Sequence, residues 1–148
     1  MSNEDVSLEI DSIKTIEHLG IVAGTFKKLK LAPIIDRALP KIGQHHLSSS
    51  QVLLALILNG LGFNERRLYL FPEYCRDLDL ERLIGPGISA DNLNESVIGR
   101  LLDGIYEYGA SKLFSDLVTQ MFTVYKDGVQ LCHVDTTNFS VHGEYGNE

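Results

Sequence analysis

The stretch SSSQVLLALILNGL, residues 48–61, decides the fold predicted for this chain. Ser48 stands three residues before Gln51, the spacing of a capping box, which predicts a helix from Ser49 to about Leu61. The run 52–58 is apolar without interruption, so this helix has hardly any polar face. Such a helix is buried in a soluble protein, and we expect it to form the core of a helical domain.

Further helices are predicted on both sides of this central helix. Apolar residues recur at helical spacing from Leu19 to Lys30, and a short helix from Leu31 to Leu39 has Pro33 in its first turn. After the centre, the pattern predicts a short helix near 67–74, a mixed segment at 78–83, and two longer helices, one from Asp91 to Gly109 and one from Ser111 to Tyr125, which we expect to pair as a helical hairpin.

One strand is predicted after the helices, in VQLCHVDTTNFSVHGEY, residues 129–145. Val129, Leu131, His133 and Asp135 fall on one face of an extended segment, and a turn signal, Asp127-Gly128, precedes them. The expected fold class is mainly α. A multi-helix N-terminal domain, residues 1–126, is followed by a C-terminal strand and turn, residues 127–148.

Charge is distributed unevenly along the 148 residues. The formal net charge of −7 argues against a chain that coats nucleic acid through bulk electrostatics. Residues 26–46, however, carry five cations and one acid, which gives +4, whereas residues 73–107 carry eight acids and three arginines, which gives −5. An anionic partner should therefore meet the basic segment, although lysines on a helix also form an ordinary solvated face. The candidate phosphate-contacting residues are Lys27, Lys28, Lys30, Arg37 and Lys41.

Asp135 is the candidate for metal chemistry. A carboxylate on a strand that enters an interior loses its hydration, and a bound cation is one way to compensate for that loss. Two other interpretations stay open. The strand can end near Asp135 in a solvated Asx-turn, or His133 and Asp135 can form the H-x-D part of a two-histidine, one-carboxylate iron site, with the second histidine supplied by His142, His45 or His46.

The string HVDTTNFSVHGEY, residues 133–145, resembles the first catalytic block of bacterial insertion-sequence transposases with a DDE active site. It is similar to the branch that reads H-x-D-T-T-x-F-x-x-x-G-E-Y at this point. The upstream strings EHLGIVAGTFKKL, LLALILNGLGF, ERRLYLF and NLNESVIGRLLDGIYEYG resemble the helical N-terminal region of that branch, so the resemblance covers nearly the whole chain from about Ile16.

This resemblance implies that Asp135 lies on the first strand of an RNase H-like catalytic domain, where it is a catalytic residue and a ligand of Mg²⁺ or Mn²⁺. The second Asp and the Glu of the family have no match in the sequence, and Glu144 is not taken as the catalytic Glu. Two metal ions need several carboxylates. We therefore expect a truncated N-terminal fragment of a transposase, inactive alone and without a stably bound metal, whose intact relatives act on insertion-sequence ends.

A stand-alone helical protein-interaction or regulatory module, without catalysis, is the alternative, and a homo-oligomer is a possible assembly for either. Cys75 and Cys132 lack zinc-finger spacing, and two isolated thiols without a secretory signal fit a reducing cytoplasm. The longest apolar run is too short to span a bilayer, so no membrane partner is expected.

Overall fold

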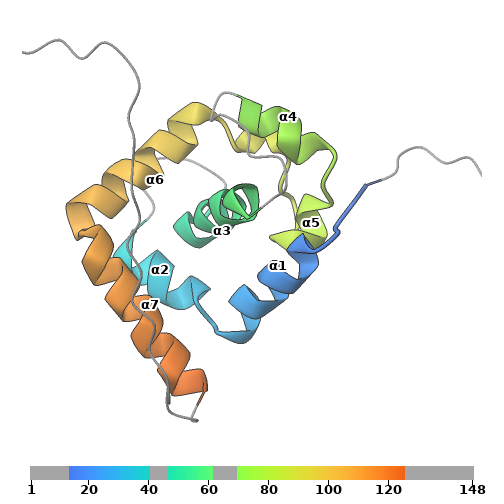
Figure 1. Ribbon diagram of the computed structural model, residues 1–148. Coiled ribbons are helices and arrows are strands. Elements are labelled where there is room, and N and C mark those ends of the chain that lie inside the picture. Colours follow the sequence, from blue (N-terminus) through green and yellow to red (C-terminus); the bar gives the residue numbers. More distant parts are fainter. Residues whose placement is uncertain (1–13, 41–46, 62–69, 126–148) are drawn as a thin grey trace, which may run out of the picture.

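The computed structural model describes residues 14–40, 47–61 and 70–125, and their regular elements are helical. Figure 1 shows α3 seen nearly end-on, with the other helices arranged in an arc around it. The mainly α fold class is thereby confirmed, whereas the predicted strand lies outside the described residues. The elements are α1 (Leu19–Lys28), α2 (Ala32–Ala38), α3 (Ser49–Gly60), α4 (Phe71–Arg76), α5 (Leu80–Leu83), the 3-10 turn η2 (Ala90–Asn92), α6 (Glu95–Tyr108) and α7 (Ala110–Val124).

The central helix α3 begins where the sequence predicts. Ser48 Oγ accepts a hydrogen bond from the Gln51 backbone N–H at 3.3 Å, and Gln51 Oε1 accepts one from the Ser48 N–H at 2.8 Å, so the capping box is confirmed. One side of α3 lies deep in the core through Val52, Leu54, Ala55 and Leu58. The opposite side, with Leu53, Leu56 and Ile57, is only half-buried.

A carboxylate fastens α2 to the start of α3. Asp36 Oδ1 accepts from the Ser50 backbone N–H at 2.8 Å, and Asp36 Oδ2 accepts from the Ser50 hydroxyl at 2.9 Å. Ser50 is 3% exposed, and its N–H belongs to the first turn of α3, where helices leave donors without internal partners. Asp36, the one acid of the basic segment, therefore has a structural role at a helix N-terminus.

The helical hairpin predicted for α6 and α7 is wrong. Gly109 alone joins the two helices, and its φ of 95° is one that glycine adopts readily. Antiparallel helices need a loop of about 2–5 residues to reverse the chain, and a single glycine only bends it. Figure 1 accordingly shows α7 continuing around the arc from the end of α6 instead of folding back along it.

Two smaller features are the short helix α4 and an isolated bridge at Thr15. The helix predicted near 67–74 is represented by α4, which begins at Phe71 with Pro72 in its first turn. Thr15 forms an isolated parallel bridge with Leu78, through Thr15 N–H to Asp77 O at 3.0 Å and Asp79 N–H to Thr15 O at 3.1 Å. Within the described ranges, no helix has the length and apolarity to cross a bilayer.

Candidate nucleic-acid interface

The cationic end of α1 is built on a Schellman motif. The Lys30 N–H donates to Lys27 O at 3.1 Å, and the Leu31 N–H donates to Phe26 O at 3.4 Å, which closes the helix after Leu29. Lys30 occupies the position of this motif that glycine usually fills, and its φ is 55°. A lysine in the left-handed region costs about 1–2 kcal/mol of backbone strain. The end of α1 therefore carries a lysine at a position where the backbone conformation favours glycine.

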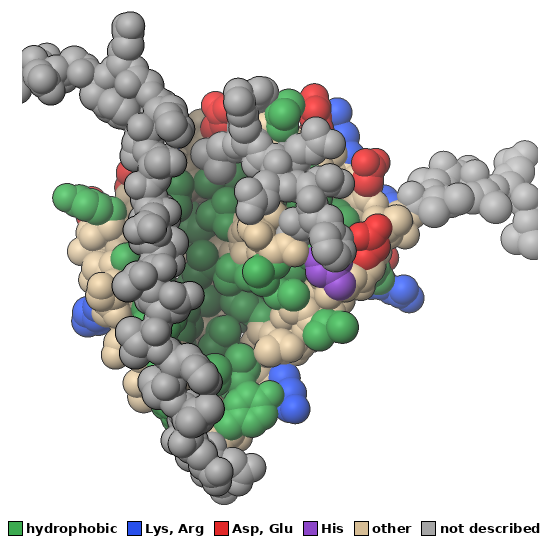
Figure 2. Space-filling view, viewed as in Figure 1, with side chains coloured by type: hydrophobic (Ala, Val, Ile, Leu, Met, Phe, Trp, Pro, Cys, Tyr) green, Lys and Arg blue, Asp and Glu red, His purple; other side chains and the backbone are tan. Residues whose placement is uncertain are grey.

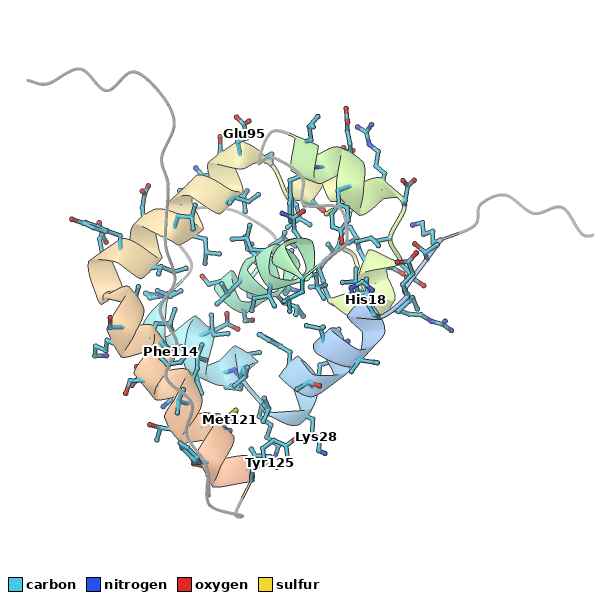
Figure 3. The ribbon with its side chains drawn as sticks, in the orientation of Figure 1. His18, Lys28, Glu95, Phe114, Met121 and Tyr125 are labelled. Atoms are coloured by element: carbon cyan, nitrogen blue, oxygen red, sulfur yellow. The ribbon has the colours of Figure 1, made fainter. Side chains whose placement is uncertain are left out.

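Lys27 and Lys28 lie in the last turn of α1 and are exposed, as is Lys30. Lys27 Nζ donates to the Arg82 carbonyl oxygen at 2.9 Å. Lys28 Nζ lies 5.4 Å from the centre of the Tyr125 ring, and Figure 3 shows these two side chains meeting between the ends of α1 and α7. Cations in a last turn also stabilise the helix dipole, so part of their role is structural. We call Lys27, Lys28 and Lys30 the cationic turn.

Arg82 joins this surface although the sequence pattern does not single it out. Its backbone carbonyl binds Lys27, which is 55 positions earlier in the chain, and its side chain is 76% exposed. Asp79 lies 3.8 Å from the Arg82 guanidinium and offsets part of its charge. Residues 73–107 are acidic on average, and only the packing of α1 against α5 reveals that one of their arginines lies beside the basic segment.

A hollow of about 320 Å³ opens beside the cationic turn. Lys27 and Lys30 stand at its edge, and its walls are mostly apolar. Lysine side chains beside an apolar cavity suit a ligand that combines an anionic group with a flat or apolar one, although the Lys27 ammonium group already donates to the Arg82 carbonyl oxygen. The remaining lining residues are Phe26, Leu31, Ala32, Pro33, Ser50, Gln51, Leu54 and Ile84.

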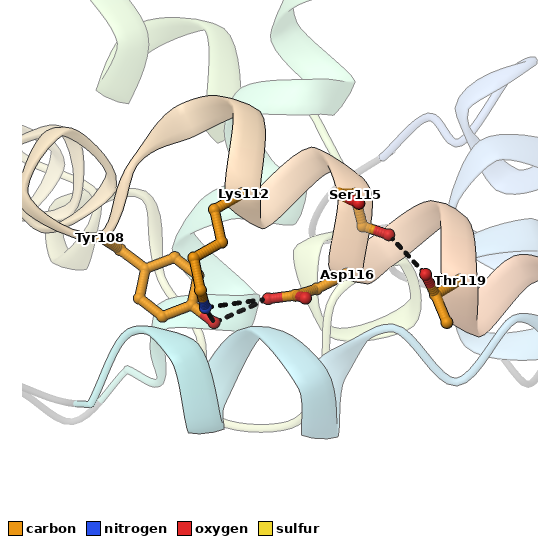
Figure 4. Close-up of polar contacts among 5 residues, drawn as sticks. All are labelled: Tyr108, Lys112, Ser115, Asp116 and Thr119. Atoms are coloured by element: carbon orange, nitrogen blue, oxygen red, sulfur yellow. Dashed lines mark hydrogen bonds and ion pairs between the residues drawn. The ribbon is translucent and has the colours of Figure 1, made fainter.

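Arg37 lies apart from the hollow at the cationic turn. It lines another hollow, of about 340 Å³, together with Tyr108, Lys112 and Asp116. Figure 4 shows how these three side chains interact: the Tyr108 hydroxyl donates to Asp116 at 2.6 Å, and Lys112 Nζ contacts both the Tyr108 hydroxyl and, at 3.5 Å, Asp116. The Tyr108 hydroxyl lowers the pKa of Asp116 and raises the pKa of Lys112. The Lys112 charge is thus already paired, whereas Arg37 forms no ion pair with an acid of the described residues.

Lys41 and Asp135, the other predicted site residues, lie outside the described residues. Among residues 14–40, 47–61 and 70–125, no three His, Cys, Asp or Glu side chains come together in an arrangement that could hold a metal ion. The metal chemistry expected from Asp135 therefore stays a prediction. Of the five predicted phosphate-contacting residues, the structure brings Lys27 and Lys30 to one hollow, places Lys28 in the same helix end, and sets Arg37 at a second hollow.

One protein family matches most of the described residues. Residues 11–119 match the family described as Domain of unknown function (DUF4277). The chain belongs to this family. The matched residues include every described helix through most of α7, so the cationic turn, the hollow beside it, and Arg37 with Tyr108, Lys112 and Asp116 fall within the DUF4277 domain. No curated protein and no solved structure matches the chain.

Proposed function

We propose that this chain is the N-terminal helical part of a DDE transposase and that it binds DNA through the cationic turn. The resemblance of residues 133–145 to the first catalytic block supports the transposase origin. The observation that carries DNA binding is the lysine with φ of 55° at the end of α1. Backbone strain of this kind persists where the side chain has a use, and phosphate contact is a use for an exposed ammonium group.

DNA binding by a few lysines has a definite signature. Each phosphate neutralised contributes about 0.9 to the slope of log Kobs against log salt, so three lysines contribute roughly 2.7. We expect weak binding to duplex DNA that falls steeply as salt is raised. The test is fluorescence anisotropy of a labelled duplex, with the parent chain compared with the triple variant Lys27→Glu, Lys28→Glu, Lys30→Glu over a series of salt concentrations.

The matched control reverses three other exposed charges, Arg76, Arg100 and Lys112, to Glu. Both variants change the net charge by −6, from −7 to −13, so bulk repulsion is equal. The control also breaks the ion pairs of Arg76 with Asp91 and of Lys112 with Asp116, so circular dichroism must show that it stays folded. The proposal expects the cationic-turn variant to lose binding and most of the salt slope, while the control retains more of both. Equal losses in the two variants contradict a specific role for the cationic turn.

Catalysis by this chain alone is not expected. In the intact family, metal ions activate a nucleophile for in-line attack on a phosphodiester, and several carboxylates hold those ions. Asp135 supplies one of them. We expect no nicking or joining of terminal-repeat DNA with Mg²⁺ or Mn²⁺. Metal-dependent nicking that disappears in Asp135→Asn contradicts this part of the proposal, whereas iron retained through purification favours the H-x-D iron site.

The stand-alone interaction module stays the second candidate because large apolar side chains are exposed on α7, namely Phe114 at 70% and Phe122 at 44%. The DNA sequence on either side of the gene distinguishes the transposase part from the stand-alone module. Terminal inverted repeats on both sides, with codons for the second Asp and the Glu downstream, support the transposase. Unrelated flanking sequence favours the module.

A further inference from the structure

The surface of α7 is divided into three sectors. Leu113, Leu117 and Gln120 face the core, whereas Ser115, Thr119 and Thr123 form a polar side. Between them lies a third sector of apolar side chains that are exposed or half-buried and that recur at positions 114, 118, 121, 122 and 125. We call this sector the apolar stripe; it consists of Phe114, Val118, Met121, Phe122 and Tyr125.

The side chains of the apolar stripe are themselves uncharged, and a cation, Lys28 Nζ, meets the stripe at Tyr125. Residues 117–124 contain no charged residue, and the charged side chains of α7, Lys112 and Asp116, are paired with each other in a different sector. Figure 3 shows Phe114, Met121 and Tyr125 placed along the length of the helix. Figure 2 shows hydrophobic side chains lining a hollow between the α6–α7 arc and the central α3, whose own half-buried side consists of Leu53, Leu56 and Ile57. Contiguous exposed apolar surface of this kind marks an interaction site.

We propose that the apolar stripe binds residues 129–141 of the same chain. Four apolar side chains of this segment, Val129, Leu131, Phe139 and Val141, fall on one face of an extended chain, and Val134 falls on the other. Asp135, its one acidic residue, shares the first face and has to lie at the solvated edge of the stripe. Burial of such side chains against Phe114 and Phe122 removes apolar surface of both partners from water. The inference concerns the surface of α7 and stands independently of DNA binding.

Chain length and direction favour this occupant over a second copy. The 15 residues of α7 span about 22 Å, which an extended chain covers in about seven residues. Residue 126 follows directly after Tyr125, the last member of the stripe, and the dipeptide Asp127-Gly128 predicts a turn from which the proposed segment would run back along α7. A tethered segment acts at an effective concentration of about millimolar, so it competes well with a second copy at micromolar concentration.

Amide hydrogen exchange of the full chain tests the proposal. We expect the amides of residues 129–141 to exchange at least about tenfold more slowly than in an unstructured chain. The double variant Phe114→Asp, Phe122→Asp should abolish this protection. The matched control, Ser115→Asp with Thr123→Asp, adds the same two charges at the neighbouring exposed positions of the polar side and should leave the protection unchanged.

A reciprocal variant and a sedimentation measurement complete the design. Leu131→Asp with Phe139→Asp alters only the segment, and should abolish the protection while the helical circular dichroism persists. Sedimentation should show a monomer in the parent and in all variants. The proposal is overturned by unprotected amides in the parent, by equal effects of the stripe and control variants, or by protection that appears only as a dimer forms, which assigns the stripe to a second copy.

Discussion

Replacing Lys30 with glycine should separate stability from DNA binding. Lys30 has a φ of 55° at the end of α1, where its Cβ lies too close to the following carbonyl oxygen. Glycine removes that strain, worth about 1–2 kcal/mol, but gains about 0.4–1 kcal/mol of freedom in the unfolded chain. The net expectation is a gain of about 0.5–1 kcal/mol, which raises Tm by roughly 2–5 °C for a domain of this size.

The same substitution removes one ammonium group from the cationic turn. The slope of log Kobs against log salt should therefore become shallower by about 0.9. Lys28→Gly is the matched control, because it removes the same charge from within the last turn of α1. There glycine costs about 1 kcal/mol of helix propensity. The two variants should weaken DNA binding alike while they shift stability in opposite directions.

Urea unfolding followed by circular dichroism gives the stability change, and fluorescence anisotropy gives the salt slope. If Lys30→Gly destabilises the protein, the left-handed lysine is not strained and the main observation behind the proposed function is lost. If it stabilises the protein but leaves the salt slope unchanged, the strain is real and Lys30 does not contact DNA.

Three further predictions concern other side chains. Asp36→Ala should cost about 1–3 kcal/mol in urea unfolding, because it leaves the buried N–H of Ser50 without its acceptor, while the Ser50 hydroxyl keeps Ser48 Oγ at 2.9 Å as a partner. Asp36→Asn, which keeps one acceptor oxygen, should cost less. Burial raises the pKa of the Cys75 thiol to about 12. In a Cys132→Ser background, a maleimide at neutral pH should therefore label Cys75 only after unfolding, and rapid labelling of the folded protein would contradict its burial. Tyr108→Phe should raise the pKa of Asp116 towards its ordinary value, which an NMR titration measures. In the parent the folded pKa of Asp116 is depressed, so its contribution to stability is present above the unfolded pKa and is lost as the pH falls through the folded pKa.

The local signals in the sequence predicted the helical core well. The capping box of Ser48 and Gln51 and the uninterrupted apolar run behind it depend on neighbouring residues alone, and both reappear in α3. The α6–α7 hairpin failed for a geometric reason. Helical periodicity identifies two helices, but the angle between them depends on the backbone of Gly109, which periodicity does not encode.

Sequence reasoning found the candidate site only in part. It selected the lysines of the cationic turn because they are close together in the chain. It missed Arg82, whose place beside Lys27 depends on how α1 packs against α5, and it grouped Arg37 with residues that line a different hollow. It also could not predict the left-handed φ of Lys30, since a lysine at the end of a helix gives no signal that it replaces glycine.

The most direct test of DNA binding at the cationic turn is an NMR titration of the isotope-labelled chain with a short duplex. If the cationic turn binds DNA, amide shifts should concentrate in residues 26–31 and around Arg82, and should vanish as salt is raised. Shifts concentrated on the apolar stripe of α7, or spread evenly over the exposed lysines and arginines, contradict it.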